Sequence, residues 1–127
     1  MIYNAKVLHL NNDVEEEVLL QIGGVELTCF VSVCPYAIAE GLSYPIELRP
    51  VIFDEYVISE LANNSVPSIS RVESSFAYVV VGEMRGACLK SGELIFEDDV
   101  LQRDFGYLDG KMVAMKIDRI DAEFLTC

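Results

Sequence analysis

The sequence FAYVVV, from Phe76 to Val81, decides the fold that this chain is expected to adopt. Six consecutive apolar residues, three of them valines and two aromatic, leave neither face of a strand suited to water. The run is short, β-branched and closed by Gly82, and these features favour a strand over a segment of buried helix. We therefore predict a central strand that is buried on both faces and covered by the rest of the chain.

Length and composition predict one compact domain over residues 1–127. Hydrophobic residues make up 52% of the chain and charged residues 24%, which is typical of a folded protein and not of a disordered one. A chain of this size removes roughly two thirds of its unfolded surface from water. We therefore expect it to fold as a single domain without disulfides, metals or cofactors.

The charge balance is strongly acidic. Nine Lys and Arg residues stand against 21 Asp and Glu, which gives a formal net charge of -12. The resulting field repels phosphate backbones and anionic membrane surfaces, so nucleic acid and membranes are not expected partners. The same field attracts basic proteins and speeds their encounter, although acidity that serves only solubility remains an alternative.

The cysteines and the N-terminus predict a cytoplasmic, reducing location. Cys29, Cys34, Cys88 and Cys127 form no CxxC pair and are expected to be structural thiols. The first residues, MIYNAKVLHLNN, carry one lysine and no long apolar run, so they do not have the pattern of a secretory signal. No stretch approaches the ~20 apolar residues of a membrane span.

The glycine pair Gly23–Gly24 is the clearest hairpin signal in the first half of the chain, after an expected strand over Ile2–Leu10. A two-residue primed turn there would give one face the pairs Ile22–Val25, Leu20–Leu27, Val18–Cys29 and Glu16–Val31. The other face would carry the mostly polar pairs Gln21–Glu26, Leu19–Thr28, Glu17–Phe30 and Glu15–Ser32. A slip of one residue would destroy this pattern, so the register is well specified.

Three segments before the central strand are less regular. Residues 34–44 suggest a crossing segment in which a short helical turn is possible. Residues 51–59 are rich in β-branched residues, which favours a strand, but their apolar spacing also fits a helix, and both alternatives stay open. Pro45 and Pro50 place any strand there at an edge or a bend. The polar residues 62–75 are expected to form a loop that separates two halves of the chain.

The second half predicts further strands. Gly82 and Gly86 interrupt an extended segment, as a bulge or bend that closes a barrel would. A turn at residues 90–93 leads into another strand, and Asp109–Gly110 predicts a second hairpin that joins residues 105–108 to residues 112–120. We therefore predict a mainly β protein with at most one or two short helices, either a small antiparallel β-barrel or a two-layer β-sandwich. The barrel is favoured, and it resembles the OB type in length and strand count.

No motif for catalysis or metal binding emerges. His9 is the only histidine, has no acid or nucleophile near it in sequence, and is expected to be structural. With scattered cysteines a zinc site is not expected, and the glycines match no phosphate-binding loop. Paired carboxylates carry no signal, because 21 acidic residues guarantee that some lie close together. Catalytic, cofactor and metal residues are therefore not predicted, and a binding protein is favoured over an enzyme.

One stretch is typical of a protein interface. FEDDVLQRDFGY, residues 96–107, interleaves aromatic and acidic residues. Its acidic triplet matches no calcium-binding loop. The candidate partner-binding residues are Glu97, Asp98, Asp99, Asp104, Phe105 and Tyr107. The alternative is a connection whose aromatic side chains pack into the core.

The sequence thus predicts a non-catalytic acidic protein-binding module. Its most concrete form is an immunity- or antitoxin-type inhibitor of a basic partner such as a nuclease toxin, because electrostatic steering gives fast capture. The alternatives are a small enzyme or ligand carrier with a pocket inside the β-barrel, and an accessory domain or subunit of a larger assembly.

Overall fold

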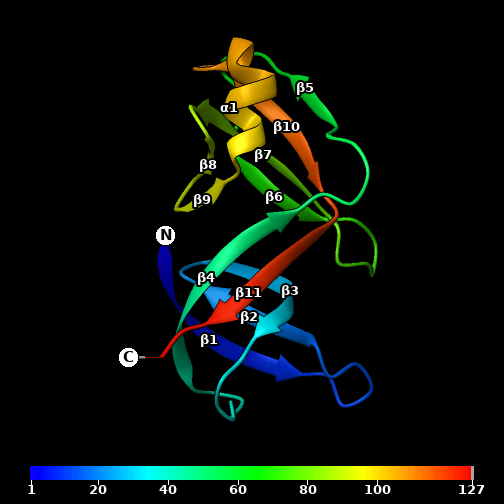
Figure 1. Ribbon diagram of the computed structural model, residues 1–127, viewed down its shortest axis with the longest axis vertical. Coiled ribbons are helices and arrows are strands. Elements are labelled where there is room, and N and C mark those ends of the chain that lie inside the picture. The colour runs from blue at the N-terminus through cyan, green and yellow to red at the C-terminus, as the bar shows by residue number, and fades with distance from the viewer. Residues whose placement is uncertain (127) are drawn as a thin grey trace. The chain divides into compact units, whose positions relative to one another are not determined.

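The computed structural model describes residues 1–126 and is mainly β (Figure 1). The chain forms two compact units. Unit 1 contains residues 1–49 and the C-terminal residues from Ile120, and unit 2 contains residues 50–119. Each unit is built on its own sheet, and among the described residues a single short α-helix lies in unit 2. The mainly β class and the low helix content are therefore confirmed, whereas folding as one domain stays a prediction.

Unit 1 is a closed five-stranded barrel. Its strands are β1 (Ile2–Leu10), β2 (Glu17–Ile22), β3 (Val25–Val33), β4 (Ser43–Val51) and β11 (Arg119–Phe124). They follow the order β1-β2-β3-β11-β4, and β4 pairs back onto β1. The spatial order β4-β1-β2-β3 is a Greek key. A five-stranded Greek-key barrel is the architecture of the OB type, so the barrel prediction is confirmed. One pair differs from the antiparallel expectation, because β11 runs parallel to β3.

The predicted hairpin is present with its predicted register. β2 and β3 pair from Glu17 with Phe30 through Ile22 with Val25. One step beyond, the N–H of Val31 donates to the carbonyl of Glu16 at 2.7 Å. Gly23 has φ 57° and Gly24 is not left-handed, which fits a primed turn with glycine at its first central position. The apolar face of this hairpin supplies much of the barrel core.

Buried apolar side chains make up the core of the barrel. The buried residues are Ala5, Val7, Val18, Leu20, Ile22, Leu27, Cys29, Ile46, Leu48, Ile120, Ala122 and Phe124. Complete burial, with a smaller contribution from Asp121, raises the pKa of the Cys29 thiol far above its ordinary range. This thiol therefore stays protonated and acts as a small apolar core residue.

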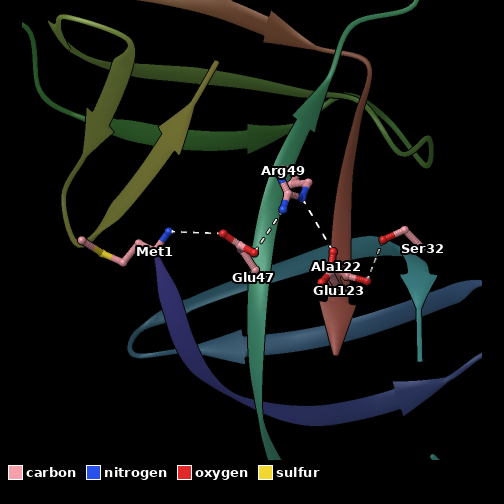
Figure 2. Close-up of polar contacts among 6 residues, drawn as sticks. All are labelled: Met1, Ser32, Glu47, Arg49, Ala122 and Glu123. Atoms are coloured by element: carbon pink, nitrogen blue, oxygen red, sulfur yellow. Dashed lines mark hydrogen bonds and ion pairs between the residues drawn. The ribbon is translucent and has the colours of Figure 1, made fainter. Parts of the chain in front are cut away.

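Polar side chains connect the strands at which the barrel closes (Figure 2). Arg49 on β4 lies 3.2 Å from Glu47 on the same strand and 3.8 Å from Glu123 on β11. Ser32 on β3 donates to the carbonyl of Ala122 on β11 at 3.3 Å. Because exposed ion pairs contribute about 0–1 kcal/mol each, the buried core and the backbone ladder stabilise the closure more than these charges do.

Unit 2 is an open sheet centred on β7 (Tyr78–Arg85). β10 (Met112–Ile117) pairs along one edge of β7. Along the other edge, β6 (Ser68–Arg71) pairs with the first half of β7 and β8 (Cys88–Ser91) pairs with the second half. β5 (Ile58–Glu60) and β9 (Leu94–Glu97) complete the sheet. The central strand predicted from FAYVVV thus exists, but it starts at Tyr78 and is central to unit 2 only.

The prediction that this strand is buried on both faces is wrong. Burial along β7 alternates, with Tyr78, Val80 and Met84 buried and Val79 and Val81 partly exposed between them. One face of the strand meets the core, and the other is only half covered. A run of consecutive apolar residues therefore overstated the burial, because a half-buried antiparallel sheet tolerates valine on its outer face.

Gly82 and Gly86 do not close a barrel. Gly82 pairs with Val113 of β10 and directly precedes Glu83, which pairs with Lys90 of β8. A Cβ atom at Gly82 would clash with the backbone carbonyl of Lys90, so this glycine permits the close approach of β8. Gly86, with φ 60°, opens the two-residue turn between Arg85 and Cys88. The chain does contain a barrel, but the reason given for it was wrong, because Gly82 and Gly86 belong to the open sheet of unit 2.

The predicted hairpin at Asp109–Gly110 is wrong. Its first arm, residues 105–108, is instead helical: Phe105 ends the helix α1 (Asp99–Phe105), and the 3-10 helix η1 (Gly106–Leu108) follows. The helical conformation buries Leu101 and Leu108, and this burial favours helix over strand in this segment. The second arm divides into β10 and β11, with Asp118 between them.

Four smaller expectations also need correction. Residues 52–57 are neither strand nor helix, and only Ile58–Glu60 form β5. The polar segment 62–75 contains β6, and the units divide after Arg49 instead. Pro45 does not mark an edge, because β4 lies between β1 and β11 in the ring, and the alternative of a bend stays a prediction. Residues 34–42 contain bends and a turn and no helix.

The helices of residues 1–126 are too short to cross a membrane.

Candidate functional site

The candidate partner-binding residues surround helix α1 in unit 2. Glu97 ends β9, and Asp98 follows with an extended backbone at φ −156° and ψ 119°. The Asp98 side chain accepts the N–H of Val100 at 3.0 Å and thereby caps the helix. Asp99 lies in the first turn and Arg103 in the last, where their charges complement the helix dipole. The start of this short helix is thus fixed by one carboxylate.

Three aromatic rings form a row beside the helix. The ring centroids of Tyr56 and Phe105 lie 5.9 Å apart, and those of Phe105 and Tyr107 lie 6.3 Å apart. Tyr56 and Phe105 are half-buried, whereas Tyr107 is 75% exposed. We call the exposed part of this region, formed by Glu97, Asp99, Asp104, Phe105 and Tyr107, the acidic aromatic surface. The most exposed ring, Tyr107, therefore contacts Phe105, which in turn contacts Tyr56.

Tyr56 connects the irregular segment 52–57 to the beginning of α1. Its hydroxyl donates to the second carboxylate oxygen of Asp98 at 2.5 Å. Partial burial first, and then the hydrogen bond to the Asp98 carboxylate, raise the pKa of Tyr56 to about 12. The Tyr56 hydroxyl is therefore a neutral donor at physiological pH. Asp98 thus has two structural partners and belongs to the framework of the surface.

The remaining acidic residues differ in their availability. Asp104 pairs with its neighbour Arg103 at 3.2 Å, and this carboxylate raises the pKa of the exposed guanidinium. Glu97 and Asp99 are exposed, and within residues 1–126 neither forms an ion pair. Of the four acidic residues predicted from the sequence, Glu97 and Asp99 therefore offer the most accessible negative charge.

The two interpretations of residues 96–107 each describe part of the stretch. Phe96 is buried in the core, as a connecting segment would require. Tyr107 points its ring to solvent, as an interface would require. Tyr56 was missed, because it lies 42 positions from Asp98 and sits in the segment whose structure the sequence left open. The helix had a readable signal, since a capping aspartate precedes apolar residues at helical spacing.

The only histidine lies at the surface of unit 1. His9 Nδ1 is 3.2 Å from a carboxylate oxygen of Glu40, and its side chain is 64% exposed. The same Glu40 oxygen accepts the backbone N–H of Leu10 at 2.8 Å, so it is held by the barrel. Within the described chain, no three His, Cys, Asp or Glu residues gather as a metal site would require. The surface around α1 is a region where exposed acidic residues and an exposed aromatic ring lie on neighbouring elements.

Comparison with known proteins identifies the family of the chain. No curated protein and no solved structure matches it. One family model matches residues 1–125, which is nearly the whole sequence. The chain therefore belongs to the family described as Uncharacterised conserved protein UCP019853.

Proposed function

We propose that this protein is a non-catalytic acidic module that binds a basic protein through the acidic aromatic surface. The observation that carries the proposal is the exposure of Tyr107, at 75%, against Phe105 at the end of α1, together with the exposed Glu97 and Asp99 at its start. Tyrosine is enriched at the energetic centres of protein interfaces, and an acidic rim selects a cationic partner. The helix cap and the Tyr56 hydrogen bond hold this arrangement ready before binding.

The charges and the aromatic rings act at different steps of binding. The net charge of -12 steers a basic protein toward the molecule and raises the association rate. Once the partner is in place, burial of Tyr107 against an apolar pocket slows dissociation. The proposal therefore assigns the on-rate mainly to Glu97 and Asp99 and the off-rate mainly to Tyr107 and Phe105.

The most concrete form of the proposal is an immunity- or antitoxin-type inhibitor of a nuclease toxin. A nuclease presents cationic groups to a phosphate backbone, and an acidic surface can occupy those groups in its place. We include a cytoplasmic location in the proposal, and the free thiols of Cys29, Cys34 and Cys88 support it. Cys127 lies outside the described residues. A neighbouring reading frame that encodes a basic toxin-like protein would supply the partner to test.

Differential capture from a host lysate tests the proposal. The three baits are the parent protein, E97K/D99K, and the control E26K/E93K, which makes the same charge change at two exposed positions outside the surface. We expect at least one basic protein that the parent and the control retain and that E97K/D99K loses at least tenfold. Equal retention by all three baits, or equal loss from both variants, would refute a specific role for this surface.

A further inference from the structure

A groove of about 750 Å³ runs along the surface of unit 1. Its walls come from the end of β1, the loop that joins β1 to β2, β3, and the segment that follows β3. Leu10, Val31 and Ile38 are half-buried apolar residues in its lining, and Glu15 and Glu16 are exposed acidic ones. The volume lies in the range of about 300–1,000 Å³ that is usual for binding pockets. The groove combines apolar area with negative charge.

The loop that carries the two acids is held in place. The Asn11 side chain accepts the backbone N–H of Asp13 at 2.8 Å and that of Val14 at 3.1 Å, and it donates to Glu17 at 2.9 Å. The carbonyl of Glu16 accepts the N–H of Val31 on β3 at 2.7 Å. The positions of Glu15 and Glu16 are therefore set by the barrel before any ligand arrives.

The opposite wall is anchored as well. The Tyr36 hydroxyl donates to the carbonyl of Leu125 at 2.7 Å, and the Cys34 thiol donates to the carbonyl of Tyr36 at 3.0 Å. These contacts fix the segment on which Ile38 lies. Two anchored walls make a preformed groove, which lowers the entropy cost of binding.

The two acids lack cationic partners. Neither Glu15 nor Glu16 forms an ion pair or a side-chain hydrogen bond with the residues that the structure describes, whereas the neighbouring Glu17 carboxylate is held by Asn11. Lys6 and Arg49 are the lysine and arginine of unit 1, Arg49 already pairs with acids of the barrel, and His9 lies against Glu40. The negative charge at the groove is therefore available to a cation supplied from outside.

We propose that this groove binds a basic peptide segment of a partner protein, in which Lys or Arg alternates with aliphatic residues. The aliphatic side chains of such a segment can pack on Leu10, Val31 and Ile38, while its Lys or Arg heads reach Glu15 and Glu16. A second copy of this chain does not fit, because its net charge of -12 opposes the acidic groove. The site is separate from the acidic aromatic surface, and it can exist whether or not that surface binds a partner.

Short blocked peptides test the groove directly. The probe is Lys-Leu-Lys-Leu-Lys, compared with Lys-Ser-Lys-Ser-Lys, and backbone amide shifts of isotope-labelled protein report where each binds. We expect shifts concentrated at Asn12, Glu15 and Ala37, and affinity for the leucine peptide at least fivefold higher. E15Q/E16Q should weaken binding of both peptides about fivefold, because two exposed charge pairs are lost. E26Q/E93Q, which removes the same charge elsewhere, should change affinity less than twofold.

A second variant tests the apolar lining. I38S should weaken the leucine peptide about fivefold and leave the serine peptide within twofold, and the difference should persist at high salt because it does not depend on charge. Shifts spread over both units, equal losses in E15Q/E16Q and E26Q/E93Q, or equal affinity for the two peptides would overturn the proposal. Any of these results would show that the acidic protein attracts cations without a specific groove.

Discussion

The carboxylate of Asp98 accepts the Tyr56 hydroxyl at 2.5 Å on one oxygen and the Val100 N–H at 3.0 Å on the other. A single side chain therefore caps helix α1 and ties the segment 52–57 to it. Glu97 and Asp99 flank this residue in sequence but face solvent. The consecutive acids thus divide into one framework residue and two surface charges, and substitutions must treat them separately.

Replacing Asp98 with alanine should lower the free energy of unfolding by about 2 kcal/mol. Loss of a helix cap costs about 1 kcal/mol, and a partly covered hydroxyl left without its acceptor costs about another 1 kcal/mol. Urea denaturation of D98A and of the control D99A measures the difference. D99A should change the free energy by less than about 0.5 kcal/mol, as is usual for exposed positions. Equal stability of the two variants would exclude the framework role.

Tyr56 should titrate at about pH 12 rather than near the ordinary value of 10. Because its folded pKa is raised, the stabilisation from this hydroxyl is complete below about pH 10 and is lost as the pH rises toward 12. The stability difference between the parent and Y56F should therefore be constant at neutral pH and shrink above about pH 10. Phenolate absorbance, compared between the parent and Y56F, isolates this residue from the other tyrosines. A titration of Tyr56 near pH 10 would contradict the hydrogen bond.

Two adjacent valines of β7 test its one-sided burial. Val80 is fully buried and Val81 is partly exposed. V80D should destabilise unit 2 by several kcal/mol, because an unpaired charge is forced into a dry core. V81D should cost much less, since its carboxylate can reach water. Thermal melting of both variants measures the two losses of stability. Similar losses in V80D and V81D would show that β7 is buried on both faces, as the sequence alone suggests.

Local patterns could be predicted from the sequence better than long-range pairings. The β2–β3 register was predictable because Gly23 and Gly24 fix the turn and the apolar pairs allow only one alignment. The parallel pairing of β11 with β3 was not, because it joins Ala122 to Val31 across most of the chain and no turn specifies it. Strands β5 to β10, which lie between β4 and β11 in sequence, form a separate sheet. The order of short strands along the sequence does not show that they belong to two sheets.

The candidate surface was predictable only in part. The aromatic and acidic residues of 96–107 indicated this surface. The hairpin predicted at Asp109–Gly110, however, left no place for the helix α1, on which several of these residues lie. Asp98 looked like one of three equivalent acids, because its two partners are visible only in three dimensions. The groove in unit 1 had no linear signal either, since the loop and the segment after β3 that line it are separated by the β2–β3 hairpin.

The association rate of the captured basic protein with E97K/D99K, measured by surface kinetics at two ionic strengths, tests the central proposal most directly. The proposal predicts that E97K/D99K associates at least tenfold more slowly than the parent at low salt, with a flatter salt dependence and a nearly unchanged dissociation rate. Y107A should instead raise the dissociation rate about 30-fold or more at both salt concentrations, as loss of an aromatic anchor would. Association of E97K/D99K at the parental rate, with E26K/E93K as the reference for net charge, would contradict the proposal and leave α1 without a role in binding.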